Sequence, residues 1–270
     1  MKKLLFLLVI FAALPAFAQK TLEVAYESSD YSYREPSDHA IGLKGKMQGG
    51  SLRYETRMRD SDMFAAFDGR WMGGTTDYDG WLQDGYGNFE KHTASDIGDY
   101  YYEARLHIGQ IYDFSQEMKL WLSAGVGYRY LKDHMNKDPY GYLRESSYVY
   151  IPFTLNLRYT GSWWSAVLGG EFDYMILGHQ TSHFDYPFED IRNDQNDGFG
   201  VRVGLKLQAD LSEKTGIFVE PFYRYWQIAG SKEEYRYGYV FTEPYNTTEE
   251  YGIRIGMTFF LGSNSDTYSF

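Results

Sequence analysis

Two carboxylates stand close together in a glycine-rich part of the chain. Asp77 and Asp79 occur in the run Gly73-Gly74-Thr75-Thr76-Asp77-Tyr78-Asp79-Gly80-Trp81. Side chains at positions i and i+2 of an extended segment point the same way, so both carboxylates can share a proton or polarise one water molecule. Two other interpretations of this stretch remain open, an ordinary Asp- and Gly-rich loop and a calcium-binding turn of low specificity.

These carboxylates follow one of ten segments that alternate between apolar and polar residues. In Gly200 to Leu211, for example, Val203, Leu205 and Leu207 fall on one side of an extended strand, whereas Arg202 and Lys206 fall on the other. Most segments reach the length of about 9 to 11 residues that a tilted strand needs to cross a bilayer. The ten predicted strands are 22–33, 51–58, 63–72, 100–112, 119–131, 148–159, 163–177, 199–211, 217–226 and 251–261. We therefore predict an all-β protein, a transmembrane antiparallel up-and-down β-barrel.

The connections between these segments alternate in length. Short breaks occur at 59–62, 114–118, 161–162 and 212–215, and long loops near 35–49, 73–97, 132–147, 178–198 and 227–249. Outer-membrane barrels have short periplasmic turns and long extracellular loops. The pattern predicts a protein of the outer membrane of a Gram-negative-type bacterium, with its loops at the cell surface and both termini in the periplasm.

The two ends of the chain carry export and assembly signals. Residues 1–18 contain Lys2 and Lys3, an apolar run and the small-x-small triplet Ala16-Phe17-Ala18, which predicts a signal peptide; a retained N-terminal anchor is the alternative. The mature barrel should then span residues 19–270. Its last strand is expected at about 250–262, followed by a short tail, 263–270, whose terminal Phe270 favours recognition by the barrel-assembly machinery.

Composition supports a barrel and excludes several other functions. Aromatic residues make up 19% of the chain, with 27 Tyr and 28 Gly, and cysteine is absent, which excludes disulfides and thiol chemistry. Loss of Lys2 and Lys3 would change the formal net charge from −11 to −13, which argues against nucleic acid as a partner. Acidic loops suggest cationic peptides or proteins as partners, although they could equally serve solubility.

Polar residues of both signs are predicted to face the inside of the barrel. The segment at 119–131, for instance, should place Trp121 and Arg129 inside and Leu122 and Val126 outside. Ten strands enclose an interior only a little wider than one that side chains fill. We expect the inward charges to pair across the lumen, leaving a plugged scaffold without a broad pore. The other predicted inward charges are Arg53, Glu55, Asp68, Arg70, Glu103, Arg105, Arg158, Glu171, Asp173, Arg202, Glu220 and Arg224.

The whole layout resembles the omptins, the outer-membrane aspartyl proteases. The resemblance rests on the ten strands, the signal peptide, the long loops, and Asp77-Tyr78-Asp79 followed closely by Trp81, where the family has Asp-x-Asp-Trp. It implies that a water molecule held between this Asp pair and an Asp-His pair attacks a peptide bond beside basic residues. It also implies that lipopolysaccharide, a partner together with the outer-membrane lipids, is needed if the protein is a protease.

The second half of the omptin site departs from the family pattern. His183 falls at the position of the catalytic histidine, but Thr181 replaces the aspartate before it, and a threonine hydroxyl cannot stabilise the imidazolium as a carboxylate does. Asp185 or His179 could compensate by a different geometry. The sequence therefore favours a divergent omptin-like barrel without full protease machinery, with an active endopeptidase using Asp77, Asp79 and His183 as the alternative.

A further resemblance concerns the end of the first predicted strand. Tyr31-Ser32-Tyr33-Arg34-Glu35-Pro36 is similar to a stretch of uncharacterised omptin-like barrels of the Protochlamydia type. The omptin resemblance implies a substrate-pocket role for Glu35; a strand end and turn is the alternative. A narrow porin and an adhesin remain as other functions. The six histidines are scattered, so neither a metal site nor another cofactor is expected.

Overall fold

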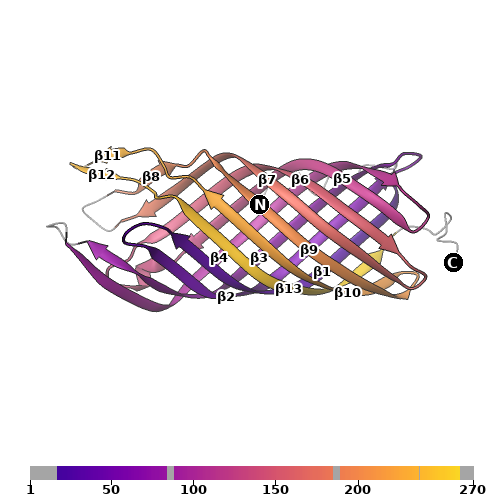
Figure 1. Ribbon diagram of the computed structural model, residues 1–270, viewed down its shortest axis with the longest axis horizontal. Coiled ribbons are helices and arrows are strands. Elements are labelled where there is room, and N and C mark those ends of the chain that lie inside the picture. The colour runs from indigo at the N-terminus through magenta and orange to yellow at the C-terminus, as the bar shows by residue number, and fades with distance from the viewer. Residues whose placement is uncertain (1–16, 84–87, 185–188, 237, 262–270) are drawn as a thin grey trace.

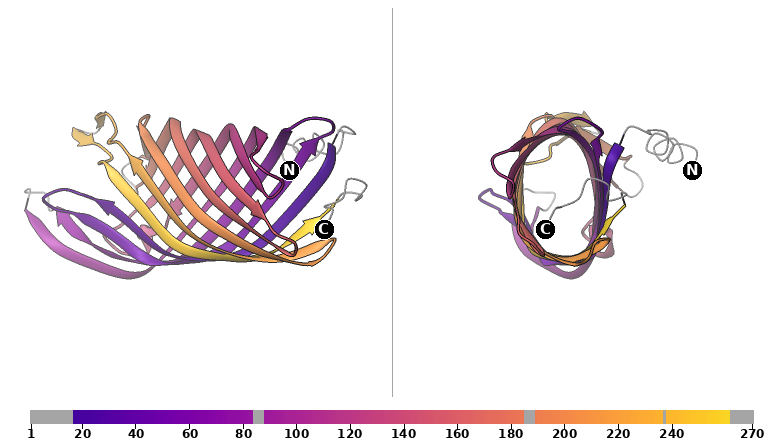
Figure 2. Two further views of the ribbon diagram at one scale, coloured as in Figure 1. Left: turned by 45° about the vertical axis from the view of Figure 1, so that its right-hand side comes forward. Right: turned by 90° about the vertical axis from the view of Figure 1, so that its right-hand side faces the viewer.

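The protein is a tall barrel of steeply tilted strands with an elliptical cross-section (Figures 1 and 2). The computed structural model describes residues 17–83, 88–184, 189–236 and 238–261; most of the predicted signal peptide and the predicted tail lie outside them. Within these ranges ten strands form the wall: β1 (Phe17–Glu35), β2 (Ile41–Met58), β3 (Met63–Gln83), β4 (Phe89–Asp113), β5 (Met118–Asp133), β6 (Leu143–Thr160), β7 (Trp164–His183), β9 (Gly198–Ser212), β10 (Thr215–Ile228) and β13 (Asn246–Phe260).

Every wall strand pairs antiparallel with its two neighbours. The barrel closes between the first and the last strand, where β1 and β13 pair from Thr21↔Phe260 to Arg34↔Thr247. The smaller elements are β8 (Ile191–Asp194), which pairs with β7, the hairpin of β11 (Glu234–Arg236) and β12 (Tyr239–Phe241), and the 3-10 helix η1 (Met135–Lys137). The predicted closed, antiparallel, ten-stranded barrel is confirmed. Among the described residues, no helix has the length and apolar character needed to span a membrane.

The strands are longer than predicted at one end of the barrel, which we call the hairpin end; the end with the short connections is the turn end. The prediction of a loop at 73–97 is wrong, because β3 and β4 stay paired through most of this range, with Thr75 opposite Gly98 and Asp79 opposite Thr93. The predicted loops near 35–49 and 132–147 shrink likewise, since β2 begins at Ile41 and β6 at Leu143. Polar residues on both faces hid these extensions from a prediction based on alternation.

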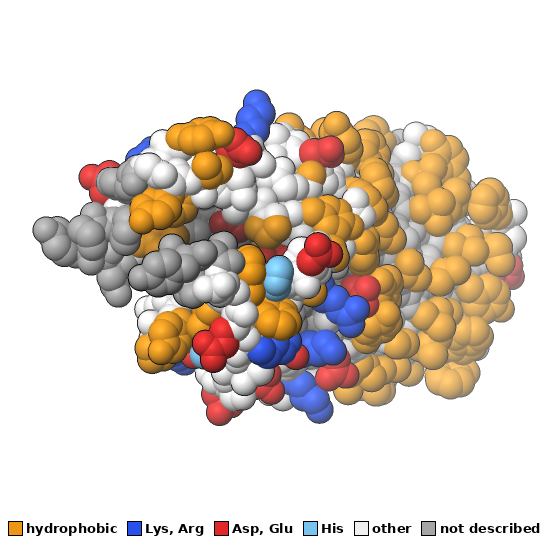
Figure 3. Space-filling model, turned by 60° about the vertical axis from the view of Figure 1, so that its left-hand side comes forward, with side chains coloured by type: hydrophobic (Ala, Val, Ile, Leu, Met, Phe, Trp, Pro, Cys, Tyr) orange, Lys and Arg blue, Asp and Glu red, His pale blue; other side chains and the backbone are white. Residues whose placement is uncertain are grey.

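The outer face of the wall divides into an apolar band and a polar part. On β9, Val203, Leu205 and Leu207 are exposed, whereas Arg202 and Lys206 are buried in the lumen, as predicted. Apolar side chains cover the half of the barrel near the turn end, while charged and polar ones gather at the hairpin end (Figure 3). The band also contains Leu52, Leu106, Ile108, Val126, Phe153, Leu168, Ile253 and Ile255, with Trp71, Tyr102 and Tyr128 along its edge toward the hairpin end. A band with an aromatic edge is typical of membrane-spanning barrels.

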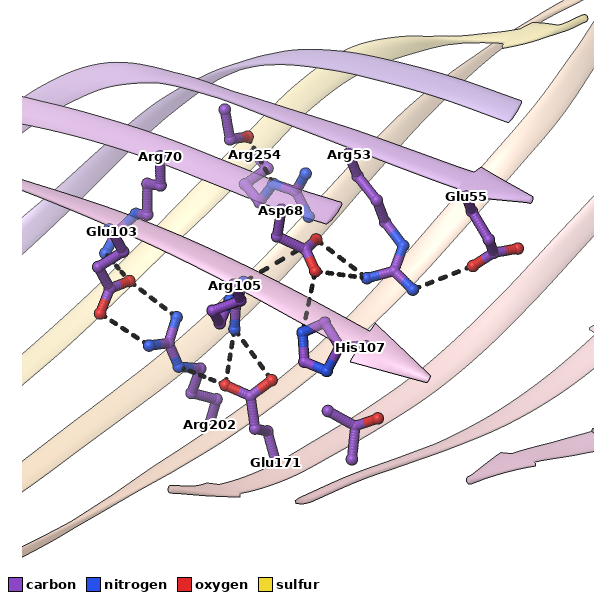
Figure 4. Close-up of polar contacts among 12 residues, drawn as sticks. Arg53, Glu55, Asp68, Arg70, Glu103, Arg105, His107, Glu171, Arg202 and Arg254 are labelled. Carbon is purple, nitrogen blue, oxygen red and sulfur yellow. Dashed lines mark hydrogen bonds and ion pairs between the residues drawn. The ribbon is translucent and has the colours of Figure 1, made fainter. Parts of the chain in front are cut away.

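Ion pairs cross the lumen and join strands that are not neighbours in the wall. Arg202 of β9 binds Glu103 of β4 through two nitrogens, at 2.8 and 2.9 Å, and Arg105 of β4 lies 2.6 Å from Glu171 of β7 (Figure 4). Arg70 of β3 contacts Glu27 at 2.6 Å and Glu250 at 2.7 Å. The predicted pairing of inward charges across the lumen is confirmed for Arg202 with Glu103 and for Arg105 with Glu171, whereas Glu27 and Glu250, which contact Arg70, were not among the predicted inward charges.

This lumen network separates two cavities. A cavity of about 50 Å³ lies at the hairpin end, and one of about 150 Å³ lies nearer the turn end. The two share no lining residue, and the cluster of Arg70, Glu27, Glu103 and Glu250 belongs to neither. Each member of this cluster is almost fully buried. The network therefore plugs the middle of the barrel between these two cavities.

Candidate functional site

Asp77 and Asp79 lie on the outer face of the extended β3 strand. Tyr78 between them points into the barrel and is buried, and the alternation of a strand puts its two neighbours outside. Asp79 forms a close ion pair with Lys91, and its side chain is 67% exposed. Asp77 accepts a hydrogen bond from the backbone N–H of Asp96 at 3.3 Å. Both carboxylates therefore contact the neighbouring strand β4 and the surroundings of the barrel.

His183 and Thr181 lie near the end of β7, on the outer face as well. Their neighbours Gln180 and Ser182 point inward and are buried. His183 Nδ1 lies 2.8 Å from an oxygen of Asp190, and Nε2 lies 3.6 Å from Glu145. Asp190 thus provides a carboxylate partner that the sequence did not identify. Asp185 and His179 were predicted as possible replacements for the missing aspartate. Asp185 lies outside the described residues. Burial lowers the pKa of His179.

The omptin-like residues are not gathered into one cluster. β3 and β7 are not neighbours in the wall, and within the described part of the chain no contact joins His183 to Asp77 or Asp79. Glu35 is separated from all of them because it points into the barrel, where it is buried. Of Asp77, Asp79, His183 and Glu35, only Glu35 contacts residues that line the cavity at the hairpin end, namely Tyr33 and Arg144.

Glu35 belongs to a charged cluster inside the hairpin end. The Tyr33 hydroxyl donates a hydrogen bond to Glu35 at 2.7 Å, and Arg144 Nη1 donates another at 3.1 Å. Arg144 also donates to Asp133 at 2.7 Å, and its guanidinium lies over the Tyr33 ring, 5.4 Å from the ring centroid. Arg144 thereby links two carboxylates from opposite parts of the wall. Tyr33, Asp133 and Arg144 line the cavity at the hairpin end.

Asp99 and Asp133 form a carboxyl pair beside the same cavity. They lie directly opposite each other on β4 and β5, beyond the apolar band. The Thr76 hydroxyl donates to Asp99 at 2.7 Å. Burial in the first place, and the charge of Asp133 in the second, raise the pKa of Asp99 to about 8. The pair therefore holds a proton at neutral pH, which is how two adjacent carboxyls avoid repulsion.

A further carboxyl group, that of Glu243, completes the acidic surroundings. Glu243 lies between β12 and β13, where the Ser182 hydroxyl donates to it at 3.3 Å. Burial raises the pKa of Glu243 to about 7, an effect that the charge of Arg144 opposes and that of Glu35 reinforces. We call Glu35, Asp99, Asp133, Arg144 and Glu243 the mouth cluster. Even with one proton on the Asp99–Asp133 pair, the carboxylates of the cluster outnumber its one guanidinium, which suits a ligand that brings positive charge.

Sequence reasoning missed most of the mouth cluster. Asp133 and Arg144 fell in the predicted loop 132–147, and Asp99 fell between a loop and a strand. Extending the predicted strands and counting every second residue would have identified these inward residues. On β5, for example, Asp133 is two inward positions beyond Arg129, which was predicted to face the lumen. In the ranges that the structure describes, no group of three or more potential ligand residues could hold a metal ion.

Replacing Asp99 with asparagine should change how stability depends on pH. Because folding raises the pKa of Asp99 from 3.8 to about 8, the folded state binds more protons than the unfolded state between these values. The stability associated with Asp99 is thus present at low pH and is lost as pH rises through this window. Urea midpoints of the wild type should fall relative to those of Asp99→Asn from about pH 5 to about pH 8.

The control for this comparison is Glu90→Gln, on the same strand but exposed. Its midpoints should run parallel to the wild-type curve. Parallel curves for Asp99→Asn would show that Asp99 is ionised at neutral pH in the folded state.

The comparisons with known proteins concern the fold. No protein-family model matches the sequence, and no curated protein matches it. The outer membrane protease OmpT from Escherichia coli is similar in structure, with 13% sequence identity, a TM-score of 0.62, and coverage of 92% of this chain and 99% of OmpT. OprG from Pseudomonas aeruginosa has 7% identity and a TM-score of 0.41 over 91% of this chain and 97% of its own. Ail from Yersinia pestis has 9% identity and a TM-score of 0.34, covering 90% of this chain and 99% of Ail.

The likeness to OmpT extends over nearly the whole of both chains, which makes it a likeness of architecture rather than of one segment. It agrees with the closed antiparallel wall of ten strands. The chain therefore has the ten-stranded barrel fold of the omptins.

Proposed function

We propose that this chain is a surface-exposed outer-membrane barrel that binds cationic ligands at its hairpin end and lacks omptin-type protease chemistry. The observation that carries the proposal is the mouth cluster: Asp99, Asp133 and Arg144 line the cavity at the hairpin end and Glu35 contacts Arg144, whereas Asp77, Asp79 and His183 lie on the outer face. A protease of the omptin type needs these three side chains around one water molecule. A binding site needs only the buried cluster and its rigid wall.

The orientation follows from the same reasoning. Residues 1–18 would direct export, the apolar band would lie in the outer membrane, and the longer, polar hairpin end would project from the cell surface, with both termini in the periplasm. Lipopolysaccharide and other outer-membrane lipids would surround the band, and Phe270 would be read by the assembly machinery. Cationic peptides or proteins are the partners that the acidic mouth fits.

The proposal is tested with refolded protein in micelles that contain lipopolysaccharide. We expect a labelled lysine-rich peptide to bind, a glutamate-rich peptide of equal length not to bind, and binding to weaken with salt, as for partly exposed charges. Glu35→Gln should weaken binding about fivefold, the effect of losing roughly 1 kcal/mol. Glu90→Gln, exposed and away from the cavity, should leave binding unchanged. Equal binding of both peptides, or no binding, would contradict the proposal.

The second candidate is an active endopeptidase of the omptin type. One contact favours it: the 2.8 Å approach of Asp190 to His183 Nδ1 restores a carboxylate partner that Thr181 does not provide. A dibasic fluorogenic peptide tests it in the same micelles. We expect no turnover; turnover that Asp79→Ala and His183→Ala both abolish would establish the protease instead. A narrow porin is less well supported, because the lumen network plugs the barrel between its two cavities.

A further inference from the structure

Arg129 and Trp226 form the floor of the cavity at the hairpin end. They come from β5 and β10, which are not neighbours in the wall, and both line the cavity. The guanidinium carbon of Arg129 lies 5.1 Å from the centroid of the Trp226 ring and 5.5 Å from that of Tyr101. Each of the two side chains is only 2% exposed. A positive charge and an indole thus meet at the bottom of a small, largely aromatic cavity.

Hydrogen-bond donors on this floor lack acceptors. In the described parts of the chain, no hydrogen-bond partner reaches Nε or Nη2 of Arg129, or Nε1 of Trp226. The nearest carboxylate belongs to Glu103, 3.9 Å from Arg129 Nε, and both of its oxygens already accept hydrogen bonds from Arg202. Buried donors in folded proteins almost always have an acceptor. Three such donors beside one cavity indicate that the acceptor is a bound group.

The chemistry of these donors selects the kind of group. Two nitrogens of a guanidinium form a planar fork that matches the two oxygens of a carboxylate, and a neighbouring indole N–H supplies a third hydrogen bond. The surrounding rings of Tyr31, Tyr101 and Tyr148 offer apolar contact. A cavity of about 50 Å³ holds a group the size of a few water molecules, so only a small anionic group fits.

We propose that the floor of the cavity binds a carboxylate, held by Arg129 and Trp226. This anion subsite goes beyond the proposed binding of cations by the mouth cluster. The mouth cluster lies nearer the hairpin end, because its member Asp133 is two inward positions beyond Arg129 on β5. The carboxylate has two possible sources. It belongs either to a free small acid, or to the C-terminus of a cationic peptide whose basic side chains remain at the mouth cluster.

The test follows the indole N–H signals of 15N-labelled protein by NMR while acetate is added at constant ionic strength. Trp226→Phe identifies the Trp226 signal. We expect this signal to shift saturably with acetate and the other indole signals to stay in place. Arg129→Gln should weaken acetate binding about tenfold or more, because it removes the charge-assisted hydrogen bonds. Lys119→Gln, on the same strand, is the matched control: Lys119 pairs with Asp113 at 3.0 Å and lines neither cavity, so this variant should bind acetate normally.

Several results would overturn the subsite. The first is a Trp226 signal that does not shift with acetate, as expected if water alone occupies the floor. The second is an acetate-induced shift of all indole signals, and the third is a shift of the Trp226 signal that persists in Arg129→Gln. Should Arg129→Gln not fold, as judged by heat-dependent mobility in gels, the Arg129 Nε–H signal is followed in Trp226→Phe. Acetate should then bind several-fold more weakly than in the wild type, and unchanged affinity would contradict the proposal.

A second arm distinguishes the two sources of the carboxylate. Trilysine with a free C-terminus is compared with its C-terminal amide. A preference for the free acid that Arg129→Gln removes would support a peptide end as the ligand. Equal binding of the two peptides, beside a positive acetate result, would support a free small acid. The acetate measurement does not depend on whether peptides bind, so the anion subsite and the proposed function can fail separately.

Discussion

Replacing Arg70 with methionine should destabilise the barrel by about 3 to 5 kcal/mol, the usual effect of removing one partner from a buried ion cluster. Arg70 lies at the centre of the plug, 2.6 Å from Glu27, 2.7 Å from Glu250 and 3.7 Å from Glu103. Without its guanidinium, three almost fully buried carboxylates would lose the partner they share, although Glu103 would keep Arg202, and Glu27 would keep Arg224 and Arg254. Their desolvation would be offset less completely, and the folded state would lose stability although methionine fills most of the volume.

Equilibrium unfolding in urea, with the protein in detergent micelles, measures this effect. Arg236→Met is the matched control, because Arg236 pairs with Glu234 at 3.1 Å on the exposed hairpin of β11 and β12. Exposed ion pairs contribute little, so the control should change the free energy of unfolding by less than about 1 kcal/mol. Similar losses for the two variants would show that the charges of the plug are hydrated in the folded barrel.

Replacing Gly125 with alanine should impair barrel closure nearly as severely. Gly125 lies on β5 opposite His107 of β4, and a Cβ atom there would overlap the carbonyl oxygen of Leu106. The obstacle is backbone rather than a movable side chain, so the two strands would have to separate. We expect a loss at or above the upper end of the range of about 1 to 3 kcal/mol that overpacking usually costs.

The control for this position is Gly170→Ala on β7. A Cβ atom at Gly170 would find its nearest neighbour, the Leu155 carbonyl oxygen, at 3.9 Å, an ordinary contact distance. The fraction of protein that shows heat-dependent mobility in gels reports refolding of each variant. Reduced refolding is expected for Gly125→Ala alone, and equal refolding of both variants would mean that β4 and β5 lie farther apart at this point.

The membrane-spanning part of the fold could be predicted from the sequence, because lipid on one side and ion pairs on the other force a strict alternation. The strand predicted at 119–131 is observed as Met118–Asp133, with Trp121 and Arg129 inside and Leu122 and Val126 outside. Beyond the band, water replaces lipid and the outer face becomes polar too. The alternation then disappears although the backbone pairing continues, so Asp77 and Asp79 were assigned to a loop.

The candidate site could be predicted only in part, for the same reason. Glu35 was identified, but its partners Arg144 and Asp133 come from strand extensions that carry no apolar pattern. Which residues face each other across the mouth depends on the register of distant strands, and a single sequence does not specify it. The pairing of His183 with Asp190 likewise depends on how the chain returns to β7 through β8.

The position of Arg70 affects how the first and last strands of the barrel are held together. β1 and β13 are the two ends of the wall, and they are joined by their backbone ladder and also through Arg70, which holds Glu27 of β1 and Glu250 of β13 at the same time. Separating β1 from β13 would remove the shared partner of the buried Glu27 and Glu250 carboxylates and would also expose the edges of two strands. In a chain without disulfides, the guanidinium of Arg70 therefore cross-links the first and last strands. The barrel has no weakly held edge from which its strands could separate one by one.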